Sequence, residues 1–360
     1  MLIRSRRYHS GLSVMTIKVS SWVFLLGGWL LLAAAGAAGG GNQQPPEPVA
    51  AALAQAQSLL AAGRTDSAID ALKAIAKSAP DDSRVIHLLG LAYYQKADYP
   101  RAVEYLSSSV KQAKEGSAQH RQAVRLIGMS HYFLGHSKEA AAYLELVKNW
   151  SPDDTENAYV LGVSYLQSHD NDKARASFGR MFAVAPDSAP AYLINAQMMI
   201  RQGLEEAAEK ELAKALALDP KLPQANFLLG ELAIYHANID LGVELLKKEI
   251  AINPGFAMSY YMLGEAYGRQ LKWDEAVAPL QKSIWLNPFF SGPYVVLGKV
   301  YLKKGDLPNA ESILRRALAM DPNNYSGHHL LAQVLQQAGR MEEAKKEFEA
   351  AESLRAAANK

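Results

Sequence analysis

The sequence predicts an all-α fold, an α-solenoid built from tandem antiparallel helix pairs. Three series of residues support this prediction, because each advances along the chain in steps of 34. Prolines stand at positions 152, 186, 220, 254, 288 and 322. One series of small residues comprises Gly128, Gly162, Ala196, Gly230, Gly264, Gly298 and Ala332, and another comprises Ala140, Ala174, Ala208, Gly242, Ala276, Ala310 and Ala344. A shared fixed period is the sequence signature of stacked structural repeats.

Each repeat has the pattern of two helices joined by a turn. In residues 257–290, one face of the first helix carries Tyr260, Leu263, Gly264 and Tyr267. A turn is expected over 268–273, and the second helix carries Ala276, Leu280 and Ile284 on one face. Pro288 ends the second helix, because the residue before a proline is pushed out of the α region. The small residues Gly264 and Ala276 are expected to meet where the two helices cross.

Nine repeats are expected over residues 49–358, starting near 49, 83, 121, 155, 189, 223, 257, 291 and 325. The step from Gly90 to Gly128 is 38, so one repeat carries four extra residues. Four residues make about one helical turn, which predicts a lengthened helix near 111–123 and an unbroken array. Single repeats cannot bury their own apolar face, so neighbours are expected to stack. The last helix, around Phe348, has one apolar stripe and a polar back that suits the end of a stack.

The repeats resemble the tetratricopeptide repeat, a helix–turn–helix unit of 34 residues. Its pattern matches Tyr260, Leu263-Gly264, Tyr267, Ala276, Leu280 and Pro288, and again Tyr294, Leu297-Gly298, Tyr301, Ala310, Leu314 and Pro322. The resemblance covers nearly all of the chain after residue 48 and implies a right-handed superhelix. Asn195-Ala196 and Gly242 depart from the pattern, which weakens packing locally and leaves the frame intact.

The N-terminal segment predicts export. Four basic residues precede or flank Trp22–Ala38, a run of 17 residues without charge, and small residues follow it. This order is typical of a secretory signal peptide or an uncleaved membrane anchor over residues 1–38, followed by a flexible linker over 39–48. The repeats are therefore expected outside the cytoplasm, in the periplasm or cell envelope of a bacterium. A mitochondrial transit segment is the alternative, and translation could start at Met1 or Met15.

Composition argues against several classes of function. The chain has 38 basic and 36 acidic residues, so a nucleic-acid binder that works through a strong positive field is not expected. It contains no cysteine, which excludes disulfides, thiol catalysis and zinc–thiolate sites. No phosphate loop, nucleophile elbow or zinc-protease motif occurs. We therefore expect no catalytic residue, no metal site, no cofactor and no enzymatic activity.

The resemblance implies a ligand-binding groove lined by first helices, through repeat positions 2, 5, 9, 12 and 13. In this chain the predicted groove residues are His87, Tyr94, Met129, Tyr132, Phe133, Tyr159, Gln197, Arg201, Phe227, Tyr235, Tyr261, Glu265, Arg269, Lys299 and Lys303. They change from mainly aromatic to mainly charged along the chain. Part of the aromatic set could instead fill gaps between repeats. Leu88, Leu126 and Val160 occupy positions where some family members carry a Lys/Asn/Arg carboxylate clamp, so recognition of chaperone tails is not expected.

These observations favour a non-catalytic scaffold that binds protein or peptide segments and assists complex assembly. Exposed aromatic residues beside scattered charges make good anchors for an extended or helical peptide. The alternative is an envelope factor that binds or escorts a polysaccharide by stacking the same aromatic residues on sugar rings. Nucleic acid is not an expected partner, and membrane contact is expected only through the N-terminal segment.

Overall fold

The computed structural model describes residues 47–358, and all of its regular elements are helices. The predicted signal segment over 1–38 and nearly all of the predicted linker lie outside the described residues. Among the helices of residues 47–358, none combines the length and the apolar character that a membrane span requires.

The helices fall into two compact units, with the boundary between Ser168 and His169 in the fourth expected repeat. The described part of the first unit contains α1 (Glu47–Ala61), α2 (Thr65–Ser78), α3 (Ser83–Gln95), α4 (Tyr99–Gln112), α5 (Ala118–Phe133), α6 (Ser137–Trp150) and α7 (Thr155–Gln167). The four extra residues lengthen α5 to 16 residues and add one residue to the connection that precedes it. The helix predicted to be lengthened is therefore α5.

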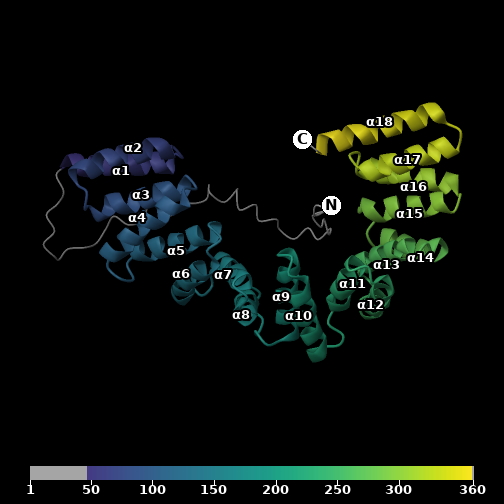
Figure 1. The fold of residues 1–360 in the computed structure, drawn as a ribbon, viewed down its shortest axis with the longest axis horizontal. Coiled ribbons are helices and arrows are strands. Elements are labelled where there is room, and N and C mark those ends of the chain that lie inside the picture. Colours follow the sequence, from purple (N-terminus) through teal and green to yellow (C-terminus); the bar gives the residue numbers. More distant parts are fainter. Residues whose placement is uncertain (1–46, 359–360) are drawn as a thin grey trace. The chain divides into compact units, whose positions relative to one another are not determined.

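The second unit begins with α8 (Asn171–Met181), which has 11 residues where most second helices have 14. It continues with α9 (Ala189–Arg201), α10 (Glu205–Leu218), α11 (Ala225–Tyr235), α12 (Ile239–Ile252), α13 (Ala257–Arg269), α14 (Trp273–Leu286), α15 (Ser291–Lys303), α16 (Leu307–Met320), α17 (Tyr325–Gln337) and α18 (Met341–Ala358). Figure 1 shows these helices as successive antiparallel hairpins along the chain.

The turn inside each repeat places its fifteenth residue in the left-handed region. Five of these residues are glycines, and the others are Ala97, His169, Ala237 and Leu271. In α13, the N–H of Lys272 donates to the carbonyl of Tyr267, and the N–H of Leu271 donates to the carbonyl of Gly268. This double hydrogen bond satisfies the last carbonyls of the first helix and reverses the chain.

Within each unit the first helices form one layer and the second helices another. First helices contact the first helix of the next repeat, as between α3 and α5 in the first unit and between α13 and α15 in the second. The side chains that these helices turn away from the second helices therefore share one surface, which we call the first-helix face. The core between the two layers contains a fully buried leucine or phenylalanine from second helices, such as Leu106, Phe178 and Leu280.

The predicted helix crossing is closely packed. A Cβ atom at Gly264 would lie 2.7 Å from Cδ2 of Leu280, and its three nearest neighbours all belong to that leucine. Leu280, one turn beyond Ala276 on α14, is therefore the side chain that lies against Gly264. At the equivalent crossing of the sixth repeat, a Cβ atom on Gly242 would lie 3.1 Å from the carbonyl oxygen of Gly230, so the two small positions meet there as expected. The absence of a side chain at Gly264 still has the expected cause, because it admits the opposing helix.

Candidate functional site

In the first compact unit, a continuous group of aromatic rings extends from the first-helix face to Tyr99 at the start of the second helix α4. Tyr99 stacks on Phe133 with ring centroids 4.7 Å apart and an interplanar angle of 17°. Tyr94 meets Tyr99 at 5.9 Å, and Tyr132 meets Phe133 edge-on at 5.5 Å. Phe133 is 36% exposed, so this aromatic group reaches solvent. Such a surface offers apolar area together with phenolic hydroxyls, which suits recognition of an extended chain.

A cluster of three charged residues borders this aromatic group. Arg125 of α5 contacts Asp154 at 2.5 Å and Glu156 at 2.7 Å, both at the start of α7. Burial raises the pKa of Tyr94 well above its usual value, and the neighbouring Tyr99 adds to the rise. Tyr94 therefore stays a neutral hydrogen-bonding phenol.

Two residues of this region, Tyr99 and Arg125, are absent from the groove predicted from the sequence. Tyr99 stands at position 17 of its repeat, at the start of a second helix, and the family resemblance directs attention only to first helices. Arg125 stands at position 5 of its repeat, the register of His87 and Tyr159, and could have been found by reading that register through every repeat.

In the second unit, α13 and α11 bring charged groups to the first-helix face. Glu265 pairs with Arg269 at 2.8 Å, one helical turn further along α13. Burial raises the pKa of Glu231 to about 6, and the negative charge of Glu265 contributes to the rise. The described residues provide no hydrogen bond or ion pair to Glu231. Burial also raises the pKa of Tyr261, which lies beside Glu265.

Three predicted groove residues are buried. His87 is hydrogen-bonded through both ring nitrogens, to Ser109 Oγ at 3.0 Å and to Gln122 Oε1 at 2.9 Å. Met129 is buried in α5, and Phe227 packs edge-on against Phe256 at 5.1 Å. These three side chains pack inside the repeats, and the ligand-binding role predicted for them is replaced by the gap-filling one.

The remaining predicted residues reach the surface to different degrees. Tyr132, Tyr159, Gln197, Tyr261 and Glu265 are partly exposed, and Tyr94 is similar. Arg201, Tyr235, Arg269, Lys299 and Lys303 are exposed. Lys299 and Lys303 form no ion pair with a described residue, so their charges face solvent. The change from aromatic to charged residues thus appears as an aromatic first-helix face in one unit and a charged one in the other.

Among the described residues, no group of three or more histidine, aspartate or glutamate side chains could hold a metal ion. His328 instead bonds Glu347 Oε2 through Nδ1 at 2.6 Å and the carbonyl of Pro322 through Nε2 at 2.9 Å. Its neighbour His329 contacts Gln333.

The repeats define a class of protein, the helical-repeat proteins. Family models described as "Tetratricopeptide repeat" match residues 30–83, 53–118, 87–154 and 159–223 in one case, 258–289 in a second and 301–356 in a third. The chain therefore belongs to the tetratricopeptide repeat family.

Two curated proteins are similar over part of their length. The chain is 30% identical over 191 residues to the protein CTR9 homolog of Arabidopsis thaliana, a match that covers 51% of this chain and 17% of that protein. It is 24% identical over 168 residues to the aspartyl/asparaginyl beta-hydroxylase of Homo sapiens, covering 43% and 22% respectively. The matches thus cover less than a quarter of either relative.

Solved structures resemble it in fold. MamA from Desulfovibrio magneticus RS-1 aligns with 19% identity and a TM-score of 0.44, covering 48% of this chain and 97% of that one. YrrB, described as a TPR protein with an unusual peptide-binding site, aligns with 19% identity and a TM-score of 0.42, covering 47% and 87%.

Proposed function

We propose that this protein is a non-catalytic scaffold that binds segments of partner proteins along its first-helix faces and so assists assembly of a complex. The supporting observation is the aromatic group of Tyr94, Tyr99, Tyr132 and Phe133, which reaches solvent at Phe133. Stacked rings of this kind give a partner large contact area at low cost in side-chain entropy.

The second unit adds charges that a partner can neutralise. Glu231 has no counter-ion among the described residues, and Lys299 and Lys303 share one helix face. A partner segment with both signs of charge would match the face of the second unit, and a segment with an apolar part would match the aromatic face of the first. Charged groups of this type act chiefly on specificity and association rate.

We also propose that the repeats act outside the cytoplasm. The support is the order of basic residues, apolar run and small residues in the first 38 positions. Protease protection in intact cells tests this, with a tag placed after Lys360. If the protease reaches the tag once the outer membrane is opened, the location is periplasmic, as proposed. If the tag stays protected until the inner membrane is lysed, the result contradicts export.

Partner binding can be tested with a triple variant of the first-helix faces, Tyr132→Ala, Phe133→Ala and Tyr261→Ala, in pull-downs from the native host. The matched control is Trp285→Ala with Phe289→Ala, because these aromatic residues are 71% and 90% exposed yet lie in and after α14, a second helix. We expect the triple variant to lose partners that the control retains. Equal recovery by both would reject the binding surface.

The same aromatic rings could stack on sugars, so a polysaccharide remains the second candidate ligand. Tyr99 and Phe133 provide a stacked aromatic pair of the kind that sugar rings pack against. A peptide library and a glycan array, probed with the wild type and the triple variant, separate the two. Binding to glycans alone, lost in the triple variant, would replace the protein-binding proposal with the polysaccharide one.

A further inference from the structure

Among the described residues, none covers the outer face of α1, whereas every later first helix is covered. At repeat position 3 the later repeats bury Val85, Ala123, Asn157, Ala191, Ala225, Ser259, Pro293 and Gly327, and at position 10 they bury Ala92, Ser130, Ser164, Met198, Leu232, Ala266, Val300 and Val334. The preceding second helix covers these positions, as where a Cβ atom on Gly327 would lie 2.9 Å from Leu318. In α1 the equivalent residues, Ala51 and Ser58, are exposed.

The composition of α1 suits contact with another helix. Residues 48–63 contain no charged side chain. Their exposed members include Ala50, Ala51, Ala54, Gln55, Gln57, Ser58 and Ala61. Terminal repeats of a stack normally carry a polar outer face for solubility. An uncharged surface of small residues instead permits close approach of a second helix.

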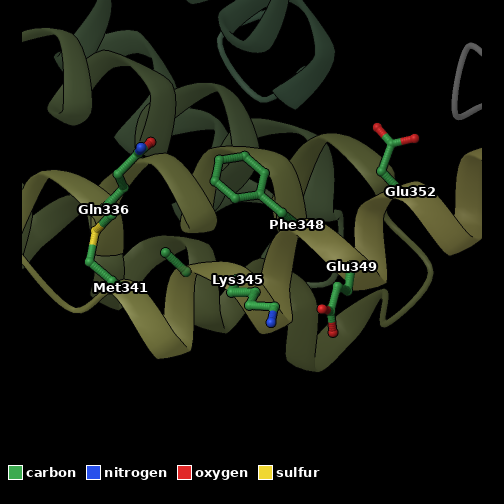
Figure 2. Close-up of a pocket in the computed structure, with 7 residues that line it drawn as sticks. Gln336, Met341, Lys345, Phe348, Glu349 and Glu352 are labelled. Carbon is green, nitrogen blue, oxygen red and sulfur yellow. The ribbon is translucent and has the colours of Figure 1, made fainter.

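The last described helix, α18, also has a surface that no described residue covers. Met341, Lys345, Phe348 and Glu352 line a pocket of about 350 Å³ together with Gln336, Ala344 and Glu349 (Figure 2). Phe348 stands at position 24, where every earlier repeat has a fully buried side chain: Leu72, Leu106, Leu144, Phe178, Leu212, Leu246, Leu280 and Leu314. Phe348 itself is only partly buried.

The residues that line this pocket stand at repeat positions against which, in internal repeats, the first helix of the next repeat packs. Val277 stands at position 21 and packs against the core that contains Leu297 and Val300 of the following repeat. Its equivalent in the last repeat is Lys345, which is exposed. The equivalent of Val300 in the first repeat is Ser58. The two uncovered faces are therefore the two halves of the interface that already joins neighbouring repeats.

We propose that α18 of one molecule binds α1 of a second copy, so that the stack of repeats continues from chain to chain. Such a contact uses different surfaces on the two partners and can add further copies in series. The charges of Lys345, Glu349 and Glu352 surround the pocket, and residues 48–61 of α1 bring no like charge against them. Because the interface is one repeat wide and has a charged rim, the association should depend on concentration.

Engineered cysteines test this directly, because the chain has none of its own. Ser58→Cys in one full-length preparation and Lys345→Cys in another are the equivalents of Val300 and Val277, which pack in one hydrophobic cluster. Mixing them under mild oxidation should give a mixed disulfide whose yield rises with protein concentration. The control replaces Lys345→Cys with Lys248→Cys, which is also exposed but lies on α12. A yield no greater than that of the control would overturn the proposal.

Sedimentation velocity supplies an independent readout. The average mass of the wild type should rise with concentration, and either Ala51→Glu or Met341→Glu should prevent the rise. Both side chains are exposed, so both variants should keep the wild-type circular dichroism spectrum. If Met341→Glu prevents association and Ala51→Glu does not, a segment other than α1 fills the pocket and the proposal is wrong. It is equally wrong if neither change has an effect.

Discussion

The carboxylate of Glu249 accepts a hydrogen bond from the backbone N–H of Gln224 at 2.7 Å, and thereby caps the start of α11 from the neighbouring helix α12. Gln224 has a φ of 71° and provides no side-chain cap of its own. Burial raises the pKa of Glu249, while the N–H groups of Gln224 and Phe227 oppose that rise. The first N–H groups of a helix need acceptors, and here a buried side chain from another helix supplies one.

Replacing Glu249 with alanine should destabilise the protein by about 1–3 kcal/mol, because buried N–H groups lose their acceptor. Glu249→Gln keeps a carbonyl oxygen and should cost less. Urea unfolding measures both. Glu244→Ala on the same helix is the control, since Glu244 is exposed and pairs only with Lys248 at 2.7 Å. Equal losses for Glu249→Ala and Glu244→Ala would argue against the capping role.

Two glycines of α13 should respond to alanine in opposite directions. A Cβ atom at Gly264 would lie 2.7 Å from Leu280 Cδ2, so Gly264→Ala should overpack the helix crossing and cost about 1–3 kcal/mol. At Gly268 the nearest atom is Trp273 at 3.7 Å, so Gly268→Ala should stabilise the helix by up to about 1 kcal/mol. Thermal melts of the two variants compare these effects, and a higher melting temperature for Gly264→Ala would reject the packing described.

The left-handed residue in the turn after α13 offers a stabilising substitution. Leu271 has a φ of 60° and is 69% exposed, so its side chain contributes little burial while its backbone is strained. Leu271→Gly should raise stability by about 0.5–1 kcal/mol, because glycine adopts this conformation without a Cβ clash. Gly305 has the same position in the next repeat with a φ of 79°, and Gly305→Ala should lower stability by a similar amount. Denaturant midpoints that move in the same direction for both variants would contradict this.

The repeat period predicts the helix pairs well, because one register repeats through the whole chain. All first helices start within three residues of the positions expected from the sequence. The period cannot decide which side chains of one register are exposed. His87 and Tyr159 share position 5, yet Tyr159 is partly exposed and His87 is buried. The ring of His87 is hydrogen-bonded to Ser109 and Gln122 of the adjacent helices. Such contacts depend on the partners in adjacent helices, and a register common to all repeats does not contain them.

The buried ion pair of Arg175 and Glu211 is a second feature that the repeat register does not predict. This position is apolar in some repeats, as at Ile69, and charged in others, as at Glu209 and Glu311, so the register alone does not predict burial here. In α8, Arg175 lies 3.4 Å from Glu211 and its side chain is 6% exposed, while Glu211 is 3% exposed. Asn195 also donates to Glu211 at 2.8 Å. Arg175 also donates to the carbonyl of Pro186 at 2.8 Å, so the burial of this pair depends on several partners outside its own repeat register.

Breaking this pair from one side should be costly. Arg175→Met leaves the buried carboxylate of Glu211 with Asn195 at 2.8 Å and Lys214 at 3.0 Å as its remaining partners, and should cost about 1–3 kcal/mol. The double variant Arg175→Met with Glu211→Met removes both charges and should recover much of that loss. A double-mutant cycle by urea unfolding measures the coupling. Additive losses would show that the two side chains do not stabilise each other.

His328 should make the last repeat sensitive to pH. Partial burial lowers the pKa of His328, but hydrogen bonds with Glu347 and the carbonyl of Pro322 outweigh it and raise the pKa above its usual value. Both ring nitrogens have an acceptor, which favours the doubly protonated ring. A group with a raised folded-state pKa contributes stability that is fully present below its unfolded-state pKa, about 6.5, and is lost as the pH rises through its folded-state pKa.

Hydrogen exchange in α17 and α18 should therefore report a less stable repeat at pH values above the folded-state pKa of His328. His328→Gln should remove this dependence, whereas His329→Gln on the adjacent residue should preserve it. A pH dependence that survives in His328→Gln would assign the effect to another group.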